Sequence, residues 1–565
     1  MARSLVANYW PSPSTCRLIN VVVSINVGSH FMLYLDGVVD NLLPAAHSFL
    51  KKHYHTEAEG TRQWELMVSL RMYGLAIGCL AATFMSRNWG RKPQVVVGMV
   101  LNIVGILLTT VIMYIPGGLA AAHIGRLING CGQGIVQTAG TVMLLELPPR
   151  RCRGTVLATM TVFACMGELL SMLLSLEEIW GNAKKWHWAM AFPIILLVPA
   201  FFVLLRAPES PRYLFMEGRQ AEATRSLEFY QIPSDAKRTE SEMMGEIDHA
   251  DIDINANAPL LKKKTAASSS GVKNRLLEGR FLRPLFVGIV LHSLVHLDDW
   301  LWVSYSTHIF EQHGFNMASA QKASLIMSLP QSLLSIGLIT IFEKFPRKSL
   351  LIYPTLASAL IGLTSIITLG FTPKKHKHVS LLSCVLPFLA SIDLCMAGIS
   401  GESAFTIVPE LFLYQDRILG TAICGIAQSL FGGMLLNFLL SALNNFGAQK
   451  VLVPFVFGNL FYAAFNAIYV PETSMKSPQE VADVLERTFS RRYGGIKEIM
   501  DGVRRRISSV RCLGTLWQVA SFAVQIALCF LAINLVFLAA SFLFPSASSI
   551  LVFPDRHILR AARPP

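Results

Sequence analysis

The sequence has little charge for its length. Only 15% of its 565 residues are charged, whereas 53% are hydrophobic, and soluble domains carry about 25% charged residues. A chain this long and this apolar cannot bury its hydrophobic surface in one water-soluble core, so lipid is its expected solvent. The fold class that follows is an all-α, polytopic membrane protein.

The sequence also lacks the short motifs of enzymes and metal sites. No HExxH, no GxSxG and no ATP-binding pattern occurs, and no paired catalytic carboxylates stand out. The ten cysteines are scattered without a CxxC pair or a metal-ligand spacing, which indicates small buried hydrophobes. We therefore expect no enzyme activity, no cofactor and no metal.

Basic residues exceed acidic ones, giving a net charge of +13, but they lie in short clusters between apolar runs. Without a basic domain or a nucleic-acid motif, no nucleic-acid partner is expected. Such clusters are typical of cytoplasmic loops that face anionic lipid. Most of them share one side if the N-terminus is cytoplasmic. One loop disagrees, because Lys374, Lys375 and Lys377 then lie outside.

Apolar runs long enough to cross a bilayer occur six times, then six times more after a long polar stretch. A further run near the C-terminus is a candidate thirteenth span. The expected units are a six-helix bundle (1–215), a cytoplasmic segment (216–280), a second six-helix bundle (281–475), a cytoplasmic tail (476–515) and the extra apolar run (516–544). Two parallel six-helix halves are a transporter architecture, with the substrate site between them near mid-membrane.

Loop motifs recur at matching places in the two halves, and they resemble the sugar-porter branch of the major facilitator superfamily. The likeness covers Ile19 to about Gln479. It implies facilitative hexose transporters or their proton-coupled relatives as the family, and alternating access as the mechanism. The motifs are Gly90-Arg91-Lys92, Arg126 with Gly130-x-Gly132-x-Gly134, Glu146 with Arg153-Gly154, Pro208-Glu209-Ser210-Pro211-Arg212-Tyr213-Leu214, Tyr305-Ser306-Thr307-x-Ile309-Phe310, Glu343 with Arg347-Lys348, Pro409-Glu410-Leu411-Phe412 with Arg417, and Pro471-Glu472-Thr473.

The charged residues of these motifs lie at cytoplasmic helix ends, where arginine can bind carboxylate with its planar fork. We expect them to pair across the two halves in the outward-open state and to separate in the other. Ordinary solvated loop charges are the alternative. The predicted gating residues are Arg91, Glu146, Arg153, Glu343, Arg347, Glu410 and Arg417.

The substrate positions depart from the family's pattern. Where the seventh helix of the family carries a Gln-Gln pair and an Asn, this chain has Leu294, Val295 and Trp300. Each apolar replacement leaves a sugar hydroxyl unpaired, at about 1–3 kcal/mol, which disfavours hexose and favours a less hydroxylated or charged solute. Glu402 replaces a proline of the motif and is the leading candidate for an unusual contact. The predicted substrate-binding residues are Thr161, Asp298, Trp300, Glu402, Phe405 and Gln428.

Three further residues are candidates for proton coupling: Asp36, His296 and Asp299. Ionisable groups at membrane depth are costly and usually functional, and histidine titrates near neutrality. We expect His292, His296 and Asp299 on one helix face. The alternatives are solvated groups near the outer interface, or a metal site of two histidines and one aspartate.

The sequence therefore predicts a secondary transporter of a small solute, a sugar or related polyol, by uniport or proton symport, in the plasma membrane. The expected partners are the solute and the lipid bilayer, and the sequence leaves the oligomeric state open. Two alternatives remain: an organic ion or metabolite carrier on the same fold, and a non-transporting solute receptor.

Overall fold

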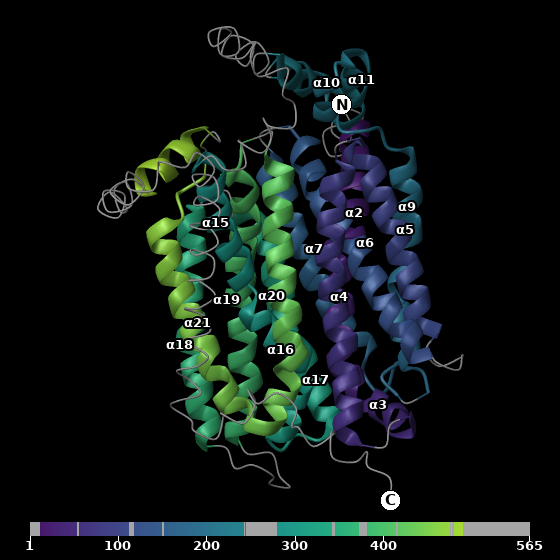
Figure 1. Cartoon of the computed structure of the whole chain (residues 1–565), viewed down its shortest axis with the longest axis vertical. Helices are drawn as coiled ribbons and strands as arrows, with labels where there is room; N and C mark the ends of the chain where they lie inside the picture. Colours follow the sequence, from purple (N-terminus) through teal and green to yellow (C-terminus); the bar gives the residue numbers. More distant parts are fainter. Residues whose placement is uncertain are drawn as a thin grey trace, which may run out of the picture.

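A computed structural model of the chain describes residues 12–244, with breaks at 54–55, 87, 112–117, 150–151, 183 and 242, and then residues 279–341, 345–371, 381–413, 416–474, 476 and 479–489. Within these ranges every regular element is a helix, and most run along one axis as a bundle (Figure 1). The predicted all-α fold class is confirmed. The apolar run at 516–544 lies outside the described residues.

The first half of the bundle contains the six predicted spans of the first set. Its first span is broken at Ser29, after which a short 3-10 helix leads into α3. The elements are α2 (Pro13–Gly28), η1 (His30–Leu33), α3 (Tyr34–His53), α4 (Glu57–Met85), α5 (Arg91–Thr110), α6 (Gly118–Glu146), α7 (Arg153–Leu174), α8 (Trp186–Ala191) and α9 (Pro193–Arg206).

Short helices follow the first half, and the second half begins at Gly279. Two of them, α10 (Pro211–Met216) and α11 (Gln220–Tyr230), lie at the upper end of the bundle in Figure 1, beyond α2 and α9. The second half contains α15 (Gly279–Leu294), α16 (Leu297–Gln312), α17 (Met317–Ile341), α18 (Arg347–Phe371), α19 (Leu381–Leu411), α20 (Arg417–Phe446) and α21 (Ala448–Tyr469).

Ten helical stretches within the described residues are long and apolar enough to cross a membrane. The remaining two predicted spans correspond to α6, with 29 residues, and α17, with 25. The polypeptide is thus a multi-pass membrane protein.

The seventh predicted span is two helices rather than one. α15 ends at Leu294, and α16 starts at Leu297 with His296 as its N-cap residue. The expectation that His292, His296 and Asp299 share one helix face is therefore wrong. The break changes the direction of every side chain that follows it.

Glycines allow α4 and α6 to approach until their backbones touch. A Cβ atom on Gly130 would lie 2.0 Å from the carbonyl oxygen of Arg71, and one on Gly134 would lie 2.2 Å from that of Leu75. Small residues four apart are a common way to bring membrane helices together, because packing rather than the hydrophobic effect drives their association. The Gly-rich motif in α6 is therefore a packing surface.

Replacing Gly130 with alanine is expected to destabilise the fold by about 1–3 kcal/mol, because the added methyl meets backbone that cannot move aside. The measurement is the melting temperature of the purified protein in detergent. Gly337→Ala is the matched control, since a Cβ there meets no heavy atom within 4 Å. Equal melting temperatures for the two variants would contradict the packing role.

Candidate functional site

A cavity of about 100 Å³ lies between the two halves. Helices of the first half contribute one wall, and α16, α17, α19 and α20 contribute the other. Its polar lining includes four glutamine side chains and four carboxylates. The residues that carry them are Gln133, Gln137, Gln331 and Gln428, and Asp36, Glu168, Asp299 and Glu402.

Most of the predicted substrate and proton residues line this cavity. Five of the six substrate candidates do so, and all three proton candidates do as well. These roles stay predictions, but the chain brings the residues together. The lining candidates are Thr161, Trp300, Glu402, Phe405, Gln428, Asp36, His296 and Asp299.

Asp298 does not line the cavity. Its Oδ2 accepts a hydrogen bond of 2.8 Å from Asn459 Nδ2 on α21, and the neighbouring Asp299 lines the cavity instead. The prediction of Asp298 as a residue of the substrate cavity assumed an unbroken helix. Because of the break before α16, Asp299 lines the cavity and Asp298 does not.

Asp36 forms an ion pair with Arg71, which is fully buried on α4. Arg71 also donates to the Met32 carbonyl at 2.6 Å, to Asn129 Oδ1 at 3.1 Å and to Gln133 Oε1. One guanidinium thus connects α3, α6 and the 3-10 turn of the first span, using the several donors that arginine presents in fixed directions.

Arg126, the arginine of the Gly-rich motif, donates hydrogen bonds to backbone carbonyls, those of Met67 at 3.2 Å and Leu35 at 2.7 Å. These bonds connect α6 to α4 and α3. Arg126 therefore has a structural position next to the cavity rather than in its lining.

Phe405 forms the aromatic centre of the cavity. Its ring lies 6.2 Å from that of His30, 5.1 Å from His292 and 5.3 Å from His296, centroid to centroid. His296 also lies 6.0 Å from the ring of Trp300, and its Nδ1 is 2.8 Å from Asp299 Oδ2. Because His30 belongs to the first half and Phe405 to the second, this group of rings spans the interface.

At the end opposite α10 and α11, hydrogen bonds join the two halves. We call this group the outer seam. Asn41 accepts a hydrogen bond from Thr307 at its side chain, and its backbone carbonyl accepts one from Gln321 at 3.0 Å. Glu65 Oε1 accepts from Ser441 N at 2.7 Å, and Glu65 Oε2 accepts from Ser441 Oγ at 2.9 Å. An exposed ion pair of 2.7 Å between Lys322 and Glu178 completes the seam.

At the other end, the first half has a charge network of its own. Arg91 Nε lies 3.3 Å from Glu146 Oε2, which also accepts from Ser210 Oγ at 2.5 Å. Glu209 Oε1 accepts from the backbone N–H groups of Arg91 and Lys92, at 2.9 and 3.0 Å. A carboxylate at these first N–H groups of α5 is a favourable helix N-terminal contact.

The second half repeats this network at α18. Arg347 pairs with Glu410, and Glu472 accepts from the backbone N–H groups of Arg347 and Lys348, at 3.2 and 3.1 Å. Lys348 Nζ donates to the carbonyl of Ala467 at 2.9 Å, as Lys92 Nζ does to that of Leu205. The duplicated motifs therefore build duplicated structures.

Four of the predicted gating residues form these networks, but each ion pair lies within one half and does not cross to the other. The four are Arg91, Glu146, Arg347 and Glu410. Arg417 donates from Nε to the carbonyl of Pro409 at 2.9 Å, and Arg153 is the first residue of α7. Glu343 lies outside the described residues. Pairing across the halves concerns the outward-facing state and stays a prediction. Glu209 and Glu472 are not among the predicted gating residues, although their motifs, Pro-Glu-Ser and Pro-Glu-Thr, recur at matching places in the two halves.

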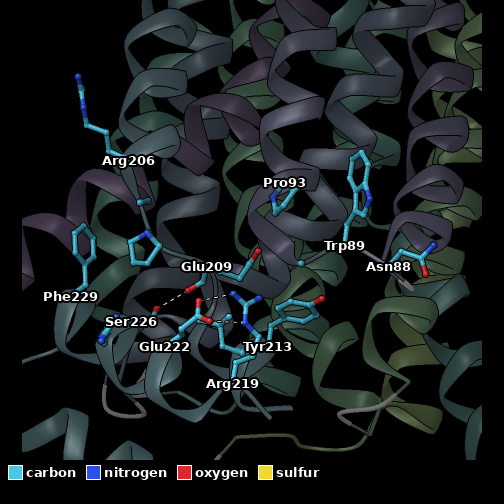
Figure 2. Close-up of a pocket in the computed structure, with 15 residues that line it drawn as sticks. Asn88, Trp89, Pro93, Arg206, Glu209, Tyr213, Arg219, Glu222, Ser226 and Phe229 are labelled. Carbon is cyan, nitrogen blue, oxygen red and sulfur yellow. Dashed lines mark hydrogen bonds and ion pairs between the residues drawn. The ribbon is translucent and has the colours of Figure 1, made fainter. Parts of the chain in front are cut away.

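A second pocket, of about 840 Å³, lies beside this network where α11 meets the loop before α5 (Figure 2). Ser226 Oγ donates to the carbonyl of Glu209 at 2.6 Å, and Tyr230 donates to that of Pro208 at 2.7 Å. Burial raises the pKa of Tyr230, so the hydroxyl stays a donor at neutral pH. These bonds position Glu209 at α5.

The fold matches solved transporters. The structure of the major facilitator superfamily proton:xylose symporter XylE bound to 6-bromo-6-deoxy-D-glucose superimposes with a TM-score of 0.67 at 19% identity, over 84% of this chain and all of that one. A partially occluded inward-open structure of XylE from E. coli superimposes with a TM-score of 0.64 at 18% identity, over 83% of this chain and all of that one. The chain is thus a polytopic protein with the major facilitator fold.

A family model for "Sugar (and other) transporter" matches residues 21–485. The chain belongs to this family, as its motifs predicted. It is similar to human "Solute carrier family 2, facilitated glucose transporter member 11", at 24% identity over 76% of this chain and 84% of the relative. It is also similar to "Glucose transporter GlcP" of Staphylococcus epidermidis, at 25% identity over 81% and 95%. These relatives are membrane transporters, and the chain is a transporter rather than an enzyme.

Proposed function

We propose that the chain carries a small polyhydroxylated solute, a sugar or related polyol, across the plasma membrane by alternating access. The observation that supports this most directly is the difference between the two ends of the interface. Hydrogen bonds join the halves at the outer seam, whereas the ion pairs at the α10 and α11 end stay within one half. Such an arrangement suits an inward-facing state of a rocking-bundle transporter.

The lining of the cavity supports a hydroxylated cargo. Gln137, Gln331 and Gln428 each present a side-chain oxygen that has no hydrogen-bond partner within the described protein. They come from α6, α17 and α20, and so approach the cavity from both halves. Buried amides of this kind recognise hydroxyl groups, because an unpaired one costs free energy. They can replace the two glutamines that the seventh helix of the family carries and that this chain lacks.

Uniport is the proposed mode of coupling. Asp36, the proton-coupling candidate of the first span, forms an ion pair with Arg71. A carboxylate held in a buried ion pair is not readily protonated, because loss of its charge would leave the arginine uncompensated.

The test is uptake of labelled D-glucose and labelled myo-inositol into proteoliposomes that contain the purified protein. Unlabelled solute inside is expected to accelerate uptake, and a pH gradient alone is expected to drive no accumulation. Cysteines at Glu178 and Lys322, joined by a short bifunctional thiol reagent, are expected to lock the seam and stop uptake. If neither solute shows exchange, the proposal is contradicted. Accumulation driven by the pH gradient would contradict uniport.

A further inference from the structure

Three carboxylates without arginine partners meet in the cavity. They belong to three helices: Glu168 to α7, Asp299 to α16 and Glu402 to α19. All three line the same cavity, and Cys165 lies in its lining with them. Glu168 and Glu402 are almost completely buried, with 4% and 1% of their surfaces exposed. Buried acids at membrane depth are costly unless something compensates their charge.

Among the described residues, no lysine or arginine forms an ion pair with them. The cavity lining contains neither lysine nor arginine. Of the arginines nearby, Arg71 pairs with Asp36 and Arg347 with Glu410, and Arg126 donates to backbone carbonyls. His296 contacts only one oxygen of Asp299. The site therefore presents three acids to which the described protein offers no lysine or arginine partner.

The unsatisfied atoms of this cavity are mostly acceptors. Both oxygens of Glu402, Oε2 of Glu168 and Oδ1 of Asp299 lack a hydrogen-bond partner. Thr406 and the backbone of Thr161 lie near Glu402 without forming a hydrogen bond of normal geometry. A ligand that fits such a site brings donors and no acceptor at that position.

Neutral groups in the same wall point to the same kind of ligand. Gln331 is 5% exposed, and its Oε1 is a further acceptor without a partner. An ammonium group supplies three N–H donors, carries the missing positive charge and has no acceptor. The rings of Phe405 and Trp300 line the cavity as well, and aromatic faces attract cations.

We propose that the cargo is a polyhydroxylated solute that carries a protonated amine, with the ammonium group held by Glu402, Glu168 and Asp299. This inference rests on the proposed function, because it concerns the cargo of the same cavity. The hydroxyl groups then meet the glutamines, and the amine meets the acids. A neutral sugar leaves the three carboxylates without a counter-charge.

The experiment compares three labelled probes in proteoliposomes: D-glucosamine, D-glucose and N-acetyl-D-glucosamine, in which acetylation removes the charge. D-glucosamine is expected to be taken up about tenfold faster than either neutral probe, which corresponds to one hydrogen bond to a charged group. Glu402→Gln is expected to remove this preference. Asp393→Asn is the matched control, because Asp393 is a buried acid of the same helix that accepts from Trp302 Nε1 at 3.0 Å and does not line the cavity.

Each outcome separates the cargo from the mechanism. Uptake of D-glucose at least equal to that of D-glucosamine, unchanged by Glu402→Gln, overturns the inference and leaves the proposed transport intact. If no probe is transported, but D-glucosamine alone raises the melting temperature of the wild type and not of Glu402→Gln, the charge inference holds and the proposed transport fails. If no probe is transported and none changes the melting temperature, both are overturned.

Discussion

Replacing Arg71 with leucine is expected to produce a large loss of stability in the first half. The change leaves Asp36 as an uncompensated charge in a buried position, 9% exposed. It also removes the hydrogen bonds that the Met32 carbonyl and Asn129 Oδ1 accept from Arg71. Breaking a buried ion pair in this way costs about 3–5 kcal/mol. The measurement is the melting temperature and the folded fraction of detergent-solubilised protein.

The double variant Arg71→Gln with Asp36→Asn provides the control. It removes both charges together, so the penalty of a lone buried carboxylate disappears and the melting temperature is expected to rise above that of Arg71→Leu. Arg71→Lys should lie between the wild type and Arg71→Leu, because lysine keeps the charge but loses the planar fork. If Arg71→Leu has the same melting temperature as the wild type, Arg71 does not stabilise the first span.

Much of the fold could be predicted because the signals are long. Each apolar run of about 20 residues predicts one span, and motifs that recur at the ends of spans align the two halves. The duplicated networks around Arg91 and Arg347 follow from these motifs. Glu209 and Glu472 could have been predicted as members of these networks, because their motifs recur at matching places in the two halves.

The break between α15 and α16 could not be predicted, because Leu294, Val295 and Leu297 continue the apolar run across it. Consecutive residues on a helix point about 100° apart, so the unrecognised break makes Asp298 a predicted substrate-binding residue although it does not line the cavity. Asp299, predicted for proton coupling, does line it. Glu168 could not be assigned to the cavity for a related reason. Its helix could be predicted, but the acids that line the cavity with it lie on α16 and α19, and one sequence does not show which helices are neighbours.

The outer seam was missed for a different reason. Asn41, Glu65 and Gln321 are single polar residues without a motif, and each acquires its role from a partner far along the chain. Glu65 and Ser441 are 376 positions apart. A lone polar residue in or beside an apolar run has a local explanation in most proteins, so only the packed structure identifies these contacts as the connection between the halves.

Glu65→Ala is expected to shift the protein toward its outward-facing state. The substitution leaves the backbone N–H and the hydroxyl of Ser441 without their acceptor, while the rest of the outer seam remains. Hydrogen bonds to a charged group contribute about 1.5–3 kcal/mol, and 1.4 kcal/mol changes an equilibrium about tenfold. Because these bonds exist only when the outer ends meet, their loss destabilises one state and not the other.

The distance between spin labels at Glu178 and Lys322 measures this shift directly, in a background without the other reactive cysteines. These residues lie on opposite halves and form an exposed ion pair, and exposed pairs contribute little to stability, so labelling there perturbs the seam only slightly. Glu65→Ala should increase the population with a long distance about tenfold or more. Glu65→Gln should increase it less, since its amide oxygen can still accept from Ser441. Identical distance distributions in all three proteins would mean that the outer seam does not control which side of the cavity is open.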